Sequence, residues 1–413
     1  MLVWLIAALT VAGILVRPKG WPEAVWACLG AAVLVAAGRL PFPAAVAAVV
    51  EGFDVCLFLT GMMLLSELAR REGVFDWLAS HAVAAARGSK ARLFTLVYLV
   101  GTVVTVFLSN DATAVVLTPA VYAAVKKARA KPLPYLLICA FIANAASFVL
   151  PISNPANLVV YGKSLPPLLV WLRTFLPASA LSILATFFAL RFLSRGELGG
   201  RIELDSAPVC LSHAGRFAAI GILGTGGILI AASALGRDLG LPTCIAATVV
   251  VLAVTRLKSG APAEIAKGVS WTVLPLVAGL FVLVEALNRA GARDNVGQAL
   301  RWCAALPRPA GSVAASFGMA ALSNLTNNLP AGLLAGGALR ATPVAAAIRD
   351  AVLIGIDLGP NLSVTGSLAT VLWLIALRRE NENIGVWQFL KAGLIVMPPA
   401  LLLATIGVFV SSW

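Results

Sequence analysis

The chain has 413 residues, of which 60% are hydrophobic and only 12% are charged, and its mean hydropathy is +0.94. Soluble domains are about one half apolar, so this composition excludes a soluble globular protein and indicates a membrane protein. A net charge of +13 would suggest a nucleic-acid partner in a soluble chain. Here the basic residues fall in short loops between apolar stretches, where they set orientation instead. The six cysteines form no CxxC pair and only two histidines occur, so neither a metal site nor a cofactor is predicted.

Seven stretches are long or apolar enough to cross a bilayer as helices, some only when flanking residues are added. They are residues 1–16, 22–37, 166–192, 217–235, 243–255, 271–287 and 386–410. The first has no basic residue ahead of it, which suits an uncleaved anchor better than a signal peptide. Strand-type alternation is absent, so the expected fold is an all-α membrane protein.

An internal repeat relates the two halves of the chain. Gly61–Asp76 aligns with Gly279–Asp294 at a constant offset of 218 positions. Five residues are identical in that alignment: Gly61/Gly279, Glu67/Glu285, Arg71/Arg289, Gly73/Gly291 and Asp76/Asp294. We therefore predict two repeats, residues 1–193 and 217–413, joined by a polar cytoplasmic linker over residues 194–216.

Each half contains two short helices separated by Gly, Ser and Asn residues, at Leu93–Val125 and at Gly311–Leu339. Each arm has about 14 to 16 residues, too short at about 1.5 Å per residue to cross a bilayer, so we predict two re-entrant hairpins. The remaining segments give five crossings per half, and this odd number inverts the second half. The expected fold is an inverted-repeat secondary transporter with about ten transmembrane helices, two re-entrant hairpins and two broken helices.

Lysine and arginine residues set the expected orientation. Under this topology one side carries most of them, in the loops around Arg70, Lys126, Arg195, Arg256 and Arg378. The positive-inside rule makes that side cytoplasmic and places both termini outside. The expected location is the cytoplasmic (inner) membrane of a bacterium or archaeon, with multiple passes.

The stretch LSNDATAVVLTP, Leu108–Pro119, places Asp111 in an otherwise apolar segment. An ionised Asp at the bilayer centre costs roughly 2.5 to 3.5 kcal/mol, so it must face protein or water. The helix break at Ser109 and Asn110 exposes backbone polar groups, which is tolerated at this depth only where they line a cavity. A hairpin tip beside a wet cavity meets both conditions. Burial also favours the protonated carboxyl group, as a proton carrier requires.

Three further breaks are rich in small amides and hydroxyls. They are SNPAN at residues 153–157, SNLTNNLP at 323–330 and GIDLGPNLSVTGSLAT at 355–370. Pro155 and Pro360 prevent a continuous helix, so short half-helices result. Discontinuous helices of inverted repeats that meet at the membrane midplane indicate the binding site of a secondary transporter.

Each half keeps one acid at these breaks. Asp357 is the second intramembrane carboxylate, and the repeat places Asn144 at its counterpart position. We predict Asp111 as the main proton-coupling residue and Asp357 as the second, with capping of a half-helix amino terminus as the alternative role for each. Glu67 and Glu285 each precede an arginine by four residues, and a stabilising (i, i+4) ion pair explains them.

Four stretches resemble the signature sequences of the ArsB-type arsenite and antimonite efflux pumps, within the ion transporter superfamily: LSNDATAVVLTPAV, ISNPANL, SNLTNNLPAGLL and GPNLSVTGSLATVLWL. The resemblance covers essentially the whole chain. It implies a scaffold domain, usually forming a homodimer, and a transport domain that moves as an elevator. The transport domain corresponds to about residues 92–162 and 310–377, and the scaffold to the rest. The family also allows a separate cytoplasmic ATPase subunit, since this chain has no Walker A pattern.

The motifs and the repeat together indicate a substrate site built of amides and hydroxyls, which need polar partners when they are buried. Arsenous acid is a small, largely neutral polyol that such groups can hold, and no positive charge for a dicarboxylate lies in the four motifs. Direct thiol ligation by Cys139 is not favoured. The resemblance, with the repeat for Asn144, implies this set of substrate-binding residues: Ser109, Asn110, Thr113, Asn144, Asn154, Asn157, Ser323, Asn324, Thr326, Asn327, Asn328, Thr365, Ser367 and Thr370.

The predicted function is secondary active efflux of arsenite and antimonite, as As(III) and Sb(III) hydroxides, in exchange for protons. A sodium/proton antiporter of the same superfamily is the nearest alternative, because a carboxylate with hydroxyls and carbonyls can bind either ion. A dicarboxylate carrier or a passive channel is less favoured. An intramembrane aspartyl protease is the enzymatic alternative, but its YD and GxGD motifs are absent. The chain is therefore predicted to be a transporter and not an enzyme.

Overall fold

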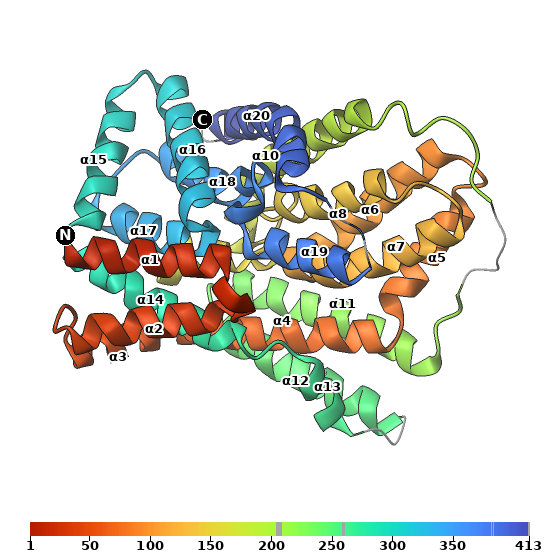
Figure 1. Ribbon diagram of the computed structural model, residues 1–413, viewed down its shortest axis with the longest axis horizontal. Helices are drawn as coiled ribbons and strands as arrows, with labels where there is room; N and C mark the ends of the chain where they lie inside the picture. Colours follow the sequence, from red (N-terminus) through yellow and green to blue (C-terminus); the bar gives the residue numbers. More distant parts are fainter. Residues whose placement is uncertain (204–208, 258–260, 381, 383, 412–413) are drawn as a thin grey trace.

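The computed structural model describes residues 1–203, 209–257, 261–380, 382 and 384–411. Within these residues the regular elements are helices, and extended pairing is limited to one bridge between Ser89 and Arg201. The expected all-α fold is confirmed. Figure 1 shows the helices packed side by side, with both chain ends toward the left and α5 toward the right.

The first half of the chain forms ten helices. They are α1 (Leu2–Val16), α2 (Glu23–Ala36), α3 (Phe42–Glu51), α4 (Phe53–Arg71), α5 (Val74–Ala85), α6 (Lys90–Phe107), α7 (Thr118–Lys127), α8 (Leu133–Ala145), α9 (Pro155–Tyr161) and α10 (Leu168–Leu193). The short α3 meets α4 at a bend of 45°. Helix α10 is the long closing helix of this half, with Pro177 inside it.

The second half repeats this order. Its helices are α11 (His213–Ala234), α12 (Gly240–Leu257), α13 (Pro262–Gly268), α14 (Val273–Arg289), α15 (Ala292–Ala305), α16 (Arg308–Thr326), α17 (Asn328–Ala341), α18 (Ala346–Leu358), α19 (Leu368–Arg379) and α20 (Val386–Ser411). The α13–α14 bend is 49°, close to that of α3–α4. Gly73 and Gly291 both have left-handed backbones, with φ 72° and 94°, and each begins a helix, α5 or α15. Glycine adopts this conformation without steric cost, which explains why the repeat keeps it.

The two halves interlock through equivalent helices. Helix α4 packs along α12 of the other half, and α14 packs along α2. A Cβ at Gly61 would lie 2.7 Å from the backbone of Thr243, and one at Gly279 would lie 2.8 Å from the backbone of Ala27. The repeated glycines therefore permit the same close helix contact twice.

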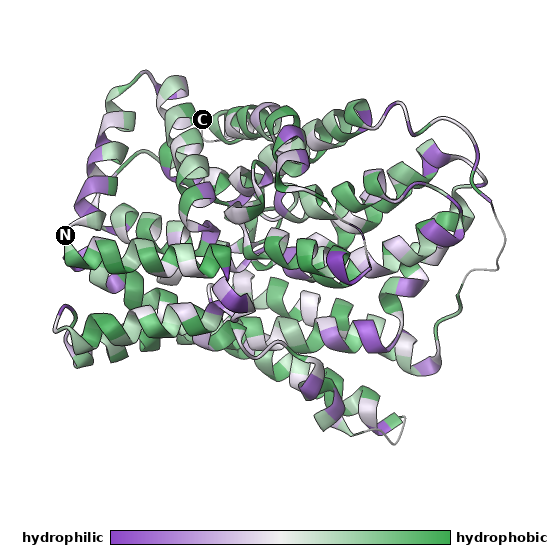
Figure 2. Ribbon diagram, in the orientation of Figure 1, coloured by the Kyte–Doolittle hydropathy of each residue, from purple (hydrophilic) through white to green (hydrophobic). Residues whose placement is uncertain are grey.

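The described residues include five helices long and apolar enough to cross a membrane, α6, α10, α11, α12 and α20, or seven spans if each bent pair counts as one. Helices α1, α2 and α8 are apolar but shorter. Figure 2 shows mostly hydrophobic ribbon along the helices and hydrophilic residues gathered near many of their ends. This pattern fits a multi-pass membrane protein with its polar residues at the two surfaces.

The first hairpin returns to the side from which it enters. The linker binds both ends of its base, because the N–H of Ile202 donates to Gly88 O at 2.8 Å and the N–H of Glu203 donates to Ala128 O at 3.1 Å. Helix α5 packs against both arms, α6 and α7, and α15 packs against both arms of the second hairpin, α16 and α17. The predicted arm length of about 14 to 16 residues holds for α17, which has 14, but was wrong for α6 and α16, which have 18 and 19. It is the break at the tip, and not a short arm, that turns the chain back.

Local chemistry explains the two tips. At the first, Ser109 Oγ accepts from the N–H of Ala112, as an N-cap does. Pro119 cannot donate to the carbonyl four residues earlier, and a π-helical turn over Ala112–Leu117 precedes the next helix, α7. At the second tip Asn327 has φ 80° and accepts from the N–H of Leu329 through its side chain. Asparagine is among the few residues that tolerate positive φ.

Two broken spans complete the middle of the protein. Between α8 and α9 lies a 3-10 turn at Pro151–Ser153, and between α18 and α19 lie turns at Gly359–Asn361 and Val364–Gly366. Asn154 caps α9 by accepting from the N–H of Ala156 at 3.0 Å. Ser367 caps α19 by accepting from the N–H of Ala369 at 3.2 Å. The two breaks thus end in equivalent capped half-helices.

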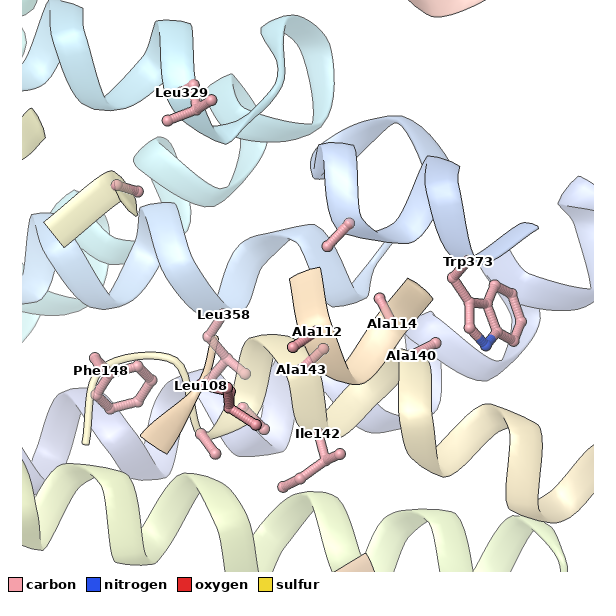
Figure 3. Packing of buried hydrophobic residues seen from close by; sticks show 14 of the residues in the cluster. Leu108, Ala112, Ala114, Ala140, Ile142, Ala143, Phe148, Leu329, Leu358 and Trp373 are labelled. Carbon is pink, nitrogen blue, oxygen red and sulfur yellow. The ribbon is translucent and has the colours of Figure 1, made fainter. Parts of the chain in front are cut away.

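Apolar side chains hold these interrupted segments together. Figure 3 shows Leu108 and Ala112 from the first hairpin tip close to Ala143 of α8 and Leu358 of α18. All four are buried, at 5% exposure or less. The hairpin tip and both broken spans therefore share one packed core.

A candidate transport site at the broken helices

A cavity of about 780 Å³ lies against the first hairpin tip. One wall comes from α4 and from the break between α13 and α14, and the other comes from the first hairpin and α19. Pro155 and Leu368, the first residues of α9 and α19, also line it. The cavity is therefore bounded by three of the four predicted breaks.

Asp111 and Ser109 are the two predicted site residues that line this cavity. The carboxylate of Asp111 is partly buried and accepts no hydrogen bond from the part of the chain that the structure describes. Its backbone N–H donates to Asn110 Oδ1 at 2.9 Å, which fixes the turn beneath it. Asp111 thus faces a space that can hold water or a ligand, and its side chain is free to bind either.

The cavity lining carries more acid than base. Four carboxyl groups and two guanidinium groups line it, those of Glu67, Asp76, Asp111, Glu380, Arg70 and Arg379. Among the residues that the structure describes, no lysine or histidine belongs to this lining. A fully ionised cavity would therefore be net negative, which is unfavourable for a highly charged anion.

Glu67 is a cavity residue whose surroundings the sequence did not reveal. The predicted (i, i+4) ion pairs are confirmed, with Arg71 Nε at 2.9 Å from Glu67 and Arg289 Nε at 2.7 Å from Glu285. Glu67 also accepts two hydrogen bonds of 2.7 Å from Arg70. Its side chain is 7% exposed, against 26% for Glu285. Glu67 therefore lines the cavity, whereas its repeat counterpart Glu285 forms an ion pair outside the cavity lining.

Asp357 lies in the interior, apart from the cavity lining, with 0% exposure. One of its oxygens accepts from Ser147 Oγ at 2.8 Å, and the other accepts from Asn154 Nδ2 at 3.0 Å. Asn144, its repeat counterpart, donates to Asn361 Oδ1 at 3.0 Å. Asp357 therefore binds Ser147, three residues after Asn144, and Asn144 binds Asn361, four residues after Asp357. These contacts join the two broken spans at the centre of the protein.

The second hairpin tip is tied to the second broken span. Asn324 accepts from Ser363 Oγ at 2.5 Å and donates to Gly359 O at 2.9 Å. Thr365 Oγ1 donates to Asn324 O at 3.0 Å, and Asn327 Nδ2 donates to Thr365 O at 3.3 Å. The polar groups of this tip are engaged with protein and lie outside the cavity lining.

The other predicted residues also lie outside that lining. Thr113 shares a hydrogen bond of 2.8 Å with Thr105, and Thr326 Oγ1 donates to Leu322 O at 2.9 Å. Ser323 Oγ and Thr370 Oγ1 are buried and have no hydrogen-bond partner in the described residues. Asn110, Asn328 and Ser367 are buried as well. Cys139 is fully buried, away from the cavity.

Sequence reasoning missed three polar residues that organise the site. Ser147 binds Asp357, Asn361 binds Asn144, and Ser363 binds Asn324. Asn361 and Ser363 stand within a motif already recognised as a break, so their composition was a usable signal. Ser147 follows Asn144 by three residues, but nothing local distinguishes it from other small helix-end residues.

Comparison with known proteins identifies the family. The model of the CitMHS family, described as "Citrate transporter", matches residues 3–355. The chain belongs to this family. It is accordingly a membrane transporter and not an enzyme, as the sequence predicted.

Among curated proteins, the chain is similar to arsenical pump membrane proteins. It is 25% identical over 411 residues to one from Escherichia coli, covering 95% of this chain and 94% of that protein. It is 28% identical over 361 residues to one from Yersinia enterocolitica, covering 82% of each. A putative arsenical pump membrane protein from Bacillus subtilis is 24% identical, with 94% of each chain covered. The predicted resemblance to arsenical pumps is confirmed.

Among solved structures, the YdaH transporter of Alcanivorax borkumensis has a similar fold. The TM-score is 0.54, the sequence identity is 16%, and the match covers 89% of this chain and 88% of that one. At this identity the likeness concerns the fold alone. It supports the all-helical fold of two repeated halves that the helix order shows.

Proposed function

We infer that this transporter exports trivalent arsenic and antimony hydroxides from the cytoplasm in exchange for protons. The observation that carries this is the acidic lining of the cavity, four carboxyl groups against two guanidinium groups. A citrate or dicarboxylate anion would meet repulsion there, whereas arsenous acid is a neutral polyol that can donate and accept hydrogen bonds. The names of the arsenical pump relatives point to the same substrate class.

Asp111 is the group that exchanges substrate for a proton in this scheme. It shares the cavity with Ser109, whose hydroxyl is a further ligand for a metalloid hydroxide. Ionised Asp111 accepts charge-assisted hydrogen bonds from the substrate hydroxyls, whereas protonated Asp111 accepts more weakly and presents an O–H donor in place of one acceptor, so it holds the substrate less tightly. The proton and the metalloid therefore compete for Asp111, which is the condition for exchange.

Asp357 is the second proton-coupling residue and acts from behind the cavity. Its two hydrogen bonds run from the first broken span, through Ser147 and Asn154. Asn154 also caps α9, whose first residue lines the cavity. A change of charge at Asp357 therefore alters the position of a cavity wall. The remaining predicted substrate residues, Asn157 excepted, enter the site when the hairpin tips and broken spans part around the ligand.

The cavity walls also support movement of a transport domain, residues 92–162 and 310–377, against a scaffold. One wall, from α4 and the α13–α14 break, belongs to the scaffold, and the other belongs to the hairpin and α19. A substrate held between two bodies that slide past each other is carried across the membrane without a continuous pore. In this proposal the protein resides in the cytoplasmic (inner) membrane of a bacterium or archaeon. Both chain termini lie on the outer side of that membrane. Dimer formation and a separate ATPase subunit are further parts of this proposal, which the resemblance of the four signature stretches implies.

The experiment is gradient-driven uptake by everted membrane vesicles that contain the protein. We expect As(III) and Sb(III) to accumulate when a proton gradient is imposed and to leak out when a protonophore collapses it. The matched control substrate is citrate, because the family description names it. Replacement of a cavity guanidinium in Arg379→Gln should leave metalloid uptake largely intact. Citrate uptake that depends on Arg379, without metalloid uptake, would contradict the proposal.

A further inference from the structure

Three backbone carbonyl groups converge on one side-chain amide in the first broken span. The Nδ2 of Asn157 lies 2.9 Å from Ser147 O, 3.3 Å from Pro151 O and 3.4 Å from Leu150 O. Asn157 is 0% exposed and lies outside the cavity lining. We call Ser147, Leu150 and Pro151 the carbonyl cage.

Two prolines explain why these carbonyls need an outside donor. In a helix the carbonyl of Ser147 would accept from residue 151 and that of Pro151 from residue 155, but both of those residues are proline and have no N–H. The Leu150 carbonyl accepts from the N–H of Ser153 in a 3-10 turn and still has a second lone pair. The spacing Ser147, Pro151, Pro155 thus leaves carbonyl oxygens without backbone partners in a buried segment.

The orientation of the Asn157 amide follows from the cage. Its nitrogen faces the three carbonyl oxygens, while its Oδ1 is buried without a hydrogen-bond partner in the described residues. Exchanging the two amide atoms would set Oδ1 against three other oxygens, an arrangement that a bound cation alone could stabilise. The partial positive charge of the NH2 group therefore occupies the place that a small cation would take.

We propose that Asn157 is the residue that makes this transporter independent of sodium. Unwound carbonyls in broken transporter helices are natural ligands for Na⁺. Here they are neutralised internally by an amide, so this span offers Na⁺ no site and the ionic coupling falls to the protons exchanged at the acids. This inference rests on the proposed metalloid/proton exchange and specifies its coupling ion.

The second broken span does not reproduce the cage. Its single break proline is Pro360, and the positions equivalent to Pro151 and Pro155 are Val364 and Leu368, which keep their N–H groups. The counterpart of Asn157 is Thr370, whose hydroxyl cannot reach over three carbonyls as a longer amide does. The Na⁺-replacing device is therefore confined to one half of the repeat.

The primary experiment is thermal unfolding of the purified protein in detergent, with sodium or choline chloride at equal ionic strength and alkaline pH. Wild type should unfold at the same temperature in both salts. In Asn157→Asp a carboxylate faces the carbonyl cage, so we expect unfolding at a lower temperature in choline and recovery by several degrees in sodium. Asn157→Ala empties the cage without adding charge. It should also unfold at a lower temperature in choline, and sodium should raise its unfolding temperature by less than it does in Asn157→Asp.

Asn288→Asp is the control, because it adds a carboxylate to α14, which supplies none of the cage carbonyls. It should show no sodium effect. A higher unfolding temperature of wild type in sodium than in choline would overturn the inference. An equal effect of sodium on the unfolding temperatures of Asn157→Asp and Asn288→Asp would overturn it as well. If Asn157→Asp does not fold, wild-type metalloid uptake at a fixed proton gradient decides: equal rates in sodium and choline support the inference, and sodium stimulation overturns it. The unfolding readout uses no metalloid, so it stands even if the proposed substrate is wrong.

Discussion

Asn154 Nδ2 donates to Asp357 Oδ1 across 3.0 Å, while the Asn154 Oδ1 accepts from the N–H of Ala156 at the start of α9. One side chain therefore both begins a half-helix in the first repeat and binds the buried acid of the second. This arrangement couples the state of Asp357 to the geometry of α9. It also explains why the break must contain an amide, which supplies a donor and an acceptor at once.

The first prediction concerns this contact. Asp357→Ala removes the acceptor of the Asn154 Nδ2 donor, while the Ser147 hydroxyl can still donate to Asn144 O. Leaving a buried donor without an acceptor costs about 1 to 3 kcal/mol, so the free energy of unfolding should fall by that amount. Thermal unfolding in detergent measures it. The exposed Asp294→Asn should be neutral, and equal stability of the two variants would show that the contact contributes nothing.

The second prediction concerns the interlocked halves. Gly61→Ala and Gly279→Ala each place a Cβ within 2.8 Å of the backbone of a facing helix. Overpacking of this kind costs about 1 to 3 kcal/mol, and both variants should unfold at lower temperature. Gly224→Ala, where a Cβ meets no atom within 4 Å, is the control. Tolerance of all three substitutions alike would mean that the contacts between α4 and α12 and between α14 and α2 can relax without cost.

The third prediction locates the cavity. In a variant without the exposed Cys28 and Cys210, Ser109→Cys should react with a water-soluble maleimide, and As(III) should slow the reaction. Ala143→Cys, at a site 1% exposed in the core (Figure 3), should remain unlabelled. Mass spectrometry counts the label on each. Labelling of Ala143→Cys at the rate of Ser109→Cys would show that the core around Ala143 is as accessible to water as the cavity, which would contradict the position of the cavity.

Much of the architecture could be predicted, because the internal repeat and the prolines and asparagines at the helix breaks determine it. The offset repeat revealed Gly73 and Gly291 as equivalent positions, and both have positive φ at a helix start. Proline and asparagine marked the four breaks. Arm length misled us, because α6 is long enough to cross a membrane and is turned back only by the break after Phe107.

The site was less predictable, because an amide or acid carries no local sign of its partner. Asn157 looked like a ligand residue, yet its nitrogen is occupied by backbone carbonyls of its own span. Glu67 looked like half of a local ion pair, and that pair exists, but its burial in the cavity depends on how α4 meets the hairpin. The partner of a polar side chain and its burial depend on tertiary packing, because packing determines which other element lies against it.

The central claim is that Asp111 exchanges a proton for the metalloid. The direct measurement compares the uptake of external As(III) by everted vesicles that contain wild type, Asp111→Asn or the exposed Asp294→Asn, with and without an imposed proton gradient. We predict that Asp111→Asn loses gradient-driven accumulation, because an amide cannot take up and release the proton, while Asp294→Asn accumulates As(III) as wild type does. Full gradient-driven accumulation by Asp111→Asn would contradict the account.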